Sequence, residues 1–231
     1  MAGGCTSLLA GGEASLERTW QAARVFRPAG TPAASRETPV VVYAHGCGGI
    51  DDDLGRWAEL LTGHGYAVVA PEHRAHAGRE PACSATALYG PADVATLATR
   101  DAEIRYALRQ LRTLPWVRQH GVFLMGVGQG AVVAAGYMGP AFAGYILTGW
   151  SCTSPYPRGR LATAPTRPVL AIRWADDPWL RGPAWSGDCA SSLGARPSSR
   201  SLVLEGSGHS VAGDPPAERA VVDFLRRHSP P

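Results

Sequence analysis

The sequence predicts a single α/β domain built on a mostly parallel sheet with helices on both faces. Short apolar runs alternate with longer segments of helical periodicity along the chain, which is the pattern of consecutive strand–helix units. The chain has 231 residues, of which 45% are hydrophobic and 18% charged. This composition suits one folded domain with a substantial core. We expect the domain to span residues 18–231, after a flexible leader at residues 1–17.

The first half of the chain is expected to alternate strands and helices. The run "VVVYAH" at 40–45 has β-branched residues on both faces, as a buried parallel strand requires. Apolar residues between Leu54 and Leu61 have helical spacing and predict an amphipathic helix. In chain order the expected elements are a strand at 20–27, a strand at 40–45, a helix at 54–65, a strand at 66–71, a loop at 71–91 and a helix of about 20 residues from Asp93.

The second half continues the alternation. The segment from 129 to 138 consists mainly of small residues and is expected to form a helix directly after a strand. The expected strands are at 121–126, 144–150, 168–174 and 201–206, and the chain is expected to close with a helix at 216–228.

Four turns follow predicted strands at the edge where functional residues of parallel sheets gather. They read "HGCGG" (45–49), "GVGQG" (126–130), "ADDPW" (175–179) and "GSGHS" (206–210). With these turns in this order, residues 18–228 resemble the α/β-hydrolase superfamily, and specifically its dienelactone-hydrolase-like branch. The resemblance implies an α/β-hydrolase fold and hydrolysis of a carboxylic ester or a related acyl bond.

The resemblance also assigns the catalytic roles. A nucleophile at position 128 would attack an acyl carbon, and His209 would act as its base. A carboxylate must orient the imidazole; Asp177 is the better match and Asp176 the second choice. The backbone N–H groups of Cys47 and Gln129 would form the oxyanion hole.

This chain departs from the family pattern because Gly128 stands where the family carries serine or cysteine. Glycine offers no nucleophile, so weak or no esterase activity is expected. The tip of such a turn has a strained backbone that glycine adopts freely, so the replacement is expected to leave the structure unchanged. Three explanations remain open. The chain is a pseudoenzyme that binds a small acyl or aromatic ligand, an engineered or otherwise inactive variant of an esterase, or an enzyme with displaced chemistry.

Displaced chemistry has two candidates. The Cys47 thiol lies on the oxyanion turn, where an imidazole could activate it; alternatively, Cys47 contributes only its N–H and its side chain is buried or bridged. The second candidate is a water activated by the His209–Asp177 pair, which would be slow without a covalent intermediate.

The substrate pocket is expected to include His45, Trp150 and Trp179, which follow strands near the predicted site. Trp185 is a further candidate of the same kind. No cofactor or metal is expected: the "EHRAH" segment at 72–76 lies in a predicted loop without a partner motif, and "DDD" at 51–53 is better explained as a helix N-cap.

The five cysteines have no zinc-ligand spacing. Cys152 and Cys189 lie on strand-end loops of one sheet edge and are candidates for a disulfide, whereas Cys83 has no obvious partner. Cys5 lies in "AGGCTS", which looks like the end of a bacterial lipoprotein signal without its apolar stretch. This favours a periplasmic or exported protein, with a cytoplasmic one as the alternative.

The expected partner is a small-molecule ester or acyl ligand. The net charge is +3 and the basic residues are scattered, so nucleic acid is not an expected partner. The sequence contains no run of 18 apolar residues, so no membrane span is predicted. Nothing in the sequence indicates the oligomeric state.

Overall fold

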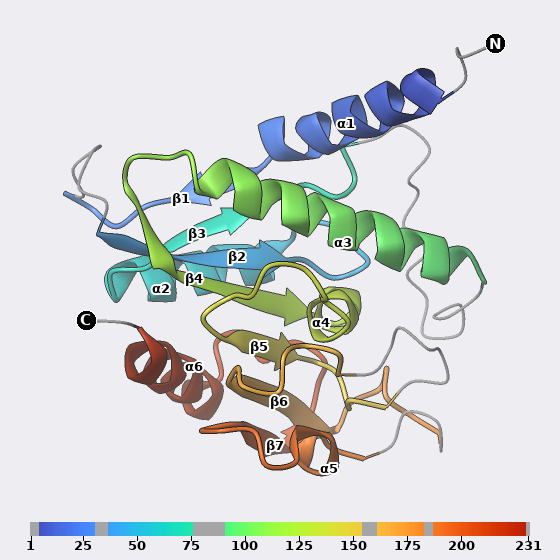
Figure 1. Cartoon of the computed structure of the whole chain (residues 1–231). Helices are drawn as coiled ribbons and strands as arrows, with labels where there is room; N and C mark the ends of the chain where they lie inside the picture. The colour runs from blue at the N-terminus through green and yellow to red at the C-terminus, as the bar shows by residue number, and fades with distance from the viewer. Residues whose placement is uncertain (1–4, 31–36, 76–90, 154–160, 183–186, 230–231) are drawn as a thin grey trace.

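Seven strands form one sheet in the part of the chain that the computed structural model describes, residues 5–30, 37–75, 91–153, 161–182 and 187–229. The strands are β1 (Arg24–Phe26), β2 (Thr38–Ala44), β3 (Ala67–Ala70), β4 (Val117–Val127), β5 (Tyr145–Thr148), β6 (Val169–Asp176) and β7 (Arg200–Ser207). Their order across the sheet is β1-β3-β2-β4-β5-β6-β7. Only β1 runs antiparallel to its neighbour. The sheet is therefore mostly parallel, as the sequence predicts (Figure 1).

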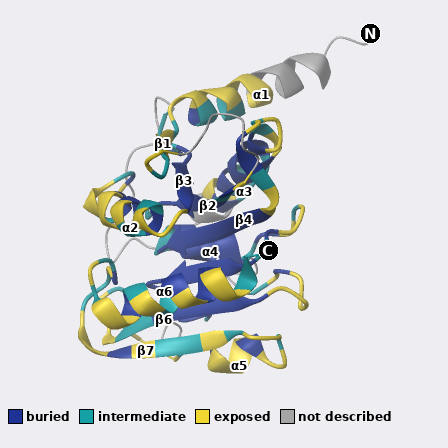
Figure 2. Cartoon of the chain, turned by 90° about the vertical axis from the view of Figure 1, so that its left-hand side faces the viewer, coloured by how far each residue is buried: buried dark blue, intermediate teal, exposed yellow. Residues whose placement is uncertain are grey.

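The helices cover both faces of this sheet. They are α1 (Cys5–Gln21), α2 (Asp52–Gly63), α3 (Pro91–Leu111), α4 (Gln129–Ala135), α5 (Ala190–Leu193) and α6 (Pro215–His228). Apolar residues of α3 and α4 form one buried cluster with the sheet, and those of α2 and α6 form a second cluster on the opposite face. Figure 2 shows the central strands buried between helices whose outer sides are exposed, whereas the edge strand β7 is partly exposed. This three-layer arrangement leaves the carboxyl ends of the parallel strands free to carry the site.

Several predicted boundaries need correction. The predicted strand at 20–27 is reduced to β1, because α1 extends to Gln21. Residues 5–17 of the segment expected to be a leader lie in α1. The end of this helix is held by Trp20, which packs against the core, and by Thr19, whose hydroxyl donates to Glu103 at 3.1 Å. These are tertiary contacts that local periodicity does not report.

The other predicted strands and helices occur close to their expected positions, and most of the predicted loop at 71–91 lies outside the described residues. Strand β4 begins at Val117, four residues before the predicted start, and α4 ends at Ala135 rather than at 138. The short helix α5 was not predicted, since four residues carry no periodic signal. Asp51 caps α2 as predicted, because its side chain accepts a hydrogen bond from the N–H of Asp53.

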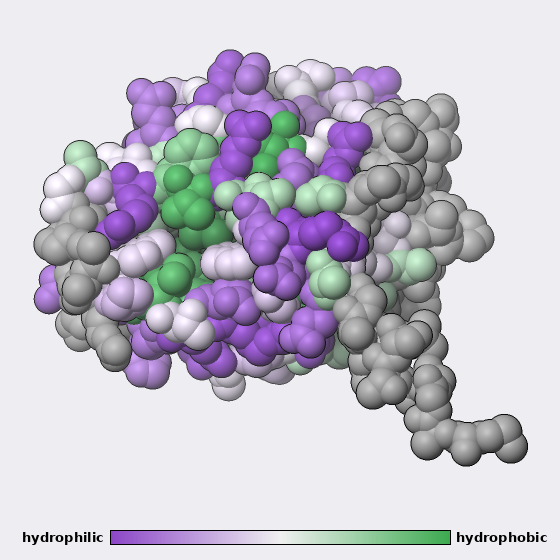
Figure 3. Space-filling model, turned by 90° about the horizontal axis from the view of Figure 1, so that it is seen from above, coloured by the Kyte–Doolittle hydropathy of each residue, from purple (hydrophilic) through white to green (hydrophobic). Residues whose placement is uncertain are grey.

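The sheet ends at β1 on one side. Seen from above, the molecular surface on this side is mostly hydrophilic and hydrophobic side chains occupy a small part of it (Figure 3). Val25 of β1 is one of the few large hydrophobic residues that are exposed. Among the described residues, no helix is long and apolar enough to cross a membrane.

Candidate functional site

The turn between β4 and α4 has the backbone of a nucleophile elbow. Gly128, at its tip, has φ 54° and ψ −116°. The two flanking glycines are required by close backbone approach: a Cβ atom on Gly126 would overlap the carbonyl of Gly130, and one on Gly130 would overlap the carbonyl of Ala44. Gly126 and Gly130 are therefore fixed by backbone packing, whereas the nearest neighbour of a Cβ atom at Gly128 is the side chain of His209.

His209 is paired with Asp177 at the neighbouring strand ends. The imidazole Nδ1 lies 2.9 Å from Asp177 Oδ2 and 3.1 Å from Oδ1. Asp177 is buried, and its Oδ1 also accepts the N–H of Trp179 at 2.9 Å. Asp176, the second choice from the sequence, is exposed and pairs with Arg181 instead. The structure thus brings His209 together with Asp177.

The imidazole of His209 packs directly against Gly128. A Cβ atom built on Gly128 would lie 2.8 Å from His209 Nε2, closer than real Cβ contacts. The same ring covers Gly149, where a built Cβ would lie 2.9 Å from Cε1. A side chain at position 128 would therefore need space that the imidazole occupies in this structure.

Trp174 supports the loop that carries His209. Its indole Nε1 donates to the carbonyl of Ser210 at 2.7 Å, and the ring packs against Gly206 and Gly208. The loop is therefore fixed on both sides of the histidine. The sequence analysis missed this role because a tryptophan at a strand end has no distinctive spacing.

A pocket of about 200 Å³ opens at these strand ends. The residues assigned to the triad and the oxyanion hole all line this pocket, except for the buried Asp177. Its lining residues are Gly46, Cys47, Gly48, Asp51, Asp53, Val127, Gly128, Gln129, Gly149, Trp179, Leu180 and His209. A hollow of about 250 Å³ between α2 and α6 lies away from the strand ends and contains none of these residues.

Two of the three predicted pocket residues do not line it. His45 and Trp150 are each 1% exposed and lie behind the pocket wall. Both follow buried strands closely, so their side chains turn into the protein rather than towards the strand-end opening. Trp179 lines the pocket as predicted, and its ring centroid lies 5.3 Å from that of His209. Trp185 lies outside the described residues.

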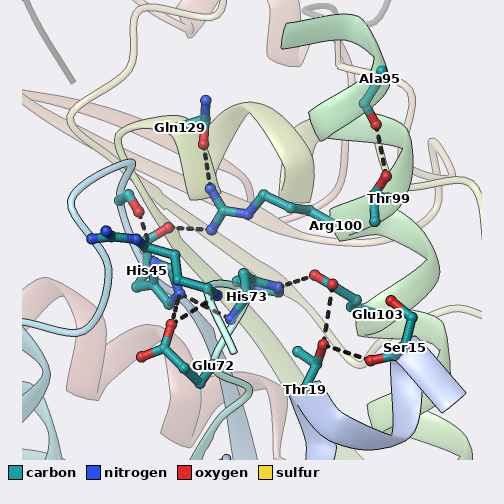
Figure 4. Close-up of polar contacts among 12 residues, drawn as sticks. Ser15, Thr19, His45, Glu72, His73, Ala95, Thr99, Arg100, Glu103 and Gln129 are labelled. Carbon is teal, nitrogen blue, oxygen red and sulfur yellow. Dashed lines mark hydrogen bonds and ion pairs between the residues drawn. The ribbon is translucent and has the colours of Figure 1, made fainter. Parts of the chain in front are cut away.

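A layer of buried polar side chains lies behind the oxyanion turn (Figure 4). Arg100 of α3 donates through one terminal nitrogen to Gln129 Oε1 at 2.7 Å and through the other to the carbonyl oxygen of His45. Glu103, one turn further along α3, contacts Nδ1 of His73 and accepts the hydroxyl of Thr19. The sequence analysis missed this layer, although Arg100 and Glu103 are charged residues on the helix that packs against the sheet.

His45 belongs to this layer, and its surroundings favour the neutral form of its ring. Burial, together with the charge of Arg100, lowers the pKa of His45 below its usual 6.5. The neutral ring matches its contacts, because Nδ1 donates to the carbonyl of Gly46 at 2.7 Å while Nε2 accepts the N–H of His73 at 3.2 Å. Glu72 lies 3.3 Å from the same Nε2, so this carboxylate forms an ion pair only if the ring gains a proton.

The state of the cysteines excludes one alternative left open by the sequence, which is Cys47 as a displaced nucleophile. Cys152 and Cys189 form a disulfide, as the sequence suggested. Cys47 is also disulfide-bonded. A bridged cysteine has no thiolate, so Cys47 can supply its backbone N–H to the pocket but not a nucleophile. Cys83 lies outside the described residues.

In the described part of the chain, no group of three or more potential metal ligands comes together. The segment at 72–76 is only partly described. Glu72 contacts His45, and His73 is engaged by Glu103; His76 lies outside the described residues.

No family model and no curated protein matches the sequence. Solved structures do match over most of the chain. The dienelactone hydrolase of Anabaena variabilis ATCC 29413 shares 18% identity, with a TM-score of 0.59 and 89% of each chain covered. A butyrate-bound esterase, Est2 of Thermogutta terrifontis, shares 16% identity with a TM-score of 0.57, covering 89% of this chain and 87% of the other.

A third similar structure is the carboxyl esterase of Bacillus coagulans in complex with glycerol. It shares 14% identity with a TM-score of 0.59, and the match covers 89% of this chain and 93% of the esterase. At these identities the likeness establishes the fold. The chain has the α/β-hydrolase fold, and the solved structures similar to it include a dienelactone hydrolase and esterases.

Proposed function

We propose that this protein keeps the binding half of an acyl-hydrolase site and lacks its covalent chemistry. It binds a small acyl or aromatic ligand in the strand-end pocket and hydrolyses esters weakly or not at all. The observation that carries this proposal is the contact between His209 and Gly128: position 128 has no nucleophile, and the imidazole already fills part of the space one would need.

The pocket wall supports an uncharged acyl ligand. The N–H groups assigned to the oxyanion hole, on Cys47 and Gln129, belong to lining residues and suit a carbonyl oxygen. Trp179 offers an aromatic surface beside His209. Two carboxylates, Asp51 and Asp53, also line the pocket, and no arginine does among the residues described. This charge distribution disfavours a carboxylate ligand.

A second candidate function is ester hydrolysis in a parent enzyme of which this chain is an inactive variant, natural or engineered. The preserved hydrogen bonds between His209 and Asp177 favour it, because a buried carboxylate that orients an imidazole is the arrangement of a catalytic base. A separate possibility is displaced chemistry, in which a water activated by the same pair hydrolyses the ester slowly.

One set of measurements separates these functions. Hydrolysis of p-nitrophenyl butyrate is measured for the unmodified protein, Gly128→Ser and Gly128→Cys, each with and without His209→Ala. Binding of butyramide to the unmodified protein is followed by NMR titration. The binding-protein proposal is supported if the unmodified protein and both Gly128 variants fail to hydrolyse the ester while the unmodified protein binds butyramide.

Other outcomes point elsewhere. Activity that appears in Gly128→Ser or Gly128→Cys and disappears with His209→Ala identifies an inactivated esterase. Substantial hydrolysis by the unmodified protein would refute the role assigned to Gly128. An inert protein that also fails to bind butyramide would refute the proposed ligand class.

A further inference from the structure

The two turns assigned to the oxyanion hole are joined by a single side chain. Arg100 is 3% exposed, and its guanidinium reaches both turns at once. One nitrogen donates to the carbonyl of His45, at the start of the turn that carries Cys47. The other donates to the side chain of Gln129, the residue after the elbow tip. Figure 4 shows Arg100 extending from α3 to these two acceptors.

The guanidinium suits this task better than other cations. Its planar fork directs two N–H groups along fixed directions, whereas an ammonium is a single point of charge. The acceptors lie just beyond two adjacent strands, because His45 directly follows β2 and Gln129 begins α4 after β4, and Ala44 of β2 is in register with Gly126 of β4. A rigid bridge between them fixes the separation of the two turns just beyond the point where sheet hydrogen bonding ends.

Burying a cation is costly, so its surroundings must compensate. Glu103 is also buried, and it is tied to α1 through Thr19 and to the segment after β3 through His73. These contacts anchor the face of α3 from which Arg100 projects. The fork is therefore presented from a fixed support rather than from a flexible surface.

We infer that Arg100 is a positioning residue that fixes the Cys47 and Gln129 N–H groups relative to each other. It acts through the His45 carbonyl and the Gln129 side chain and does not itself line the pocket. The separation of the two turns depends on this bridge whether or not a ligand binds. Only the consequence for ligand affinity rests on the proposed function.

Amide hydrogen exchange tests the positioning role in the full chain. Two turn-closing hydrogen bonds serve as reporters: Gly49 N–H to Gly46, and Ala131 N–H to Gly128. Glu218 N–H, bonded to Asp214 in α6, is the internal reference. Arg100→Met is expected to raise exchange at both reporters at least about tenfold relative to Glu218. Unchanged ratios, or equal acceleration at all three amides, would overturn the inference.

Matched variants sharpen the test. Arg105→Met removes another paired arginine of α3, whose Nε lies 2.7 Å from Asp101, and is expected to leave both ratios unchanged. Arg100→Lys is expected to restore protection at no more than one reporter; restoration of both would show that the fork is not needed. If Arg100→Met does not fold, Gln129→Met replaces it. Faster exchange at Gly49, in the turn that this substitution does not touch, supports the bridge, and an unchanged rate refutes it.

Butyramide affinity forms the second arm. The Kd is expected to rise at least about fivefold in Arg100→Met and to stay unchanged in Arg105→Met, because misplaced donors bind a carbonyl oxygen less well. Equal affinity in the unmodified protein and Arg100→Met would refute the effect on binding. If the unmodified protein does not bind butyramide, the proposed function fails, while the exchange measurement still decides the role of Arg100.

Discussion

His209 Nε2 lies 2.8 Å from the point at which Gly128 would carry a Cβ atom. The histidine and the elbow tip are thus fitted to each other in the absence of a side chain. Any residue larger than glycine at position 128 must move the imidazole, and the imidazole is held by Asp177. This relationship links the stability of the elbow to the orientation of the histidine.

Gly128→Ala is expected to destabilise the protein. The substitution forces a side chain into a backbone with φ 54° and against His209, and we expect a loss of about 1–3 kcal/mol in the free energy of unfolding. Denaturant unfolding measures it. The matched control is Gly55→Ala in α2, where a Cβ meets nothing within 4 Å; it should stabilise by about 0.5–1 kcal/mol. A Gly128→Ala protein as stable as the parent would contradict the tight contact.

Asp177→Ala is expected to cost about 1–3 kcal/mol of unfolding free energy, because it leaves the N–H of Trp179 and Nδ1 of His209 without their acceptor. Asp176→Ala removes an adjacent, exposed carboxylate and should stay within about 0.5 kcal/mol of the parent. Thermal and denaturant unfolding of the two variants give the comparison. Equal losses of unfolding free energy in the two variants would show that the hydrogen bonds of Asp177 add nothing to stability beyond those of an exposed carboxylate.

Stability is expected to fall as the pH drops below about 6.5. Burial lowers the pKa of His45, so below the unfolded-state pKa the unfolded chain binds a proton that the folded chain does not. One such histidine contributes a slope of up to about 1.4 kcal/mol per pH unit between its unfolded and folded pKa values. Burial and Arg227 lower the pKa of His228 as well, which adds to the slope.

His45→Gln tests the origin of this pH dependence. Unfolding free energies measured between pH 7.5 and 5 should show a shallower slope in the variant, whatever its stability at neutral pH. If the slope survives in His45→Gln, the buried imidazole is not its source.

The double variant Cys152→Ala/Cys189→Ala is expected to lose about 3–4 kcal/mol of stability, because the disulfide closes a loop with a sequence separation of 37. Unfolding without reductant isolates this bond from the separate one at Cys47. The single variant Cys152→Ala should lose a similar amount, since either change opens the same loop. A double variant that unfolds at the same denaturant concentration as the parent would rule out a stabilising role for the bridge.

The sequence by itself determined the order of strands and helices and the turns that carry the site. The spacing of apolar residues located β2, β4 and α3, because a strand within the sheet or a helix packed on it must repeat its apolar residues locally. The glycines of the elbow were visible for a similar reason: Gly126 and Gly130 are demanded by backbone contacts that the turn itself creates. Asp177 could be preferred over Asp176 from the proline that follows it.

The tertiary structure alone decided which side chains face the pocket and which support it. His45 and Trp150 turned inward, α1 closed over α3, and Arg100 joined two turns that lie far apart in the sequence. The position of His209 against Gly128 likewise depends on how β4 and β7 are brought together. Such contacts arise between segments whose separation along the chain leaves no periodic trace, because burial and partner choice are settled by the packing of whole elements.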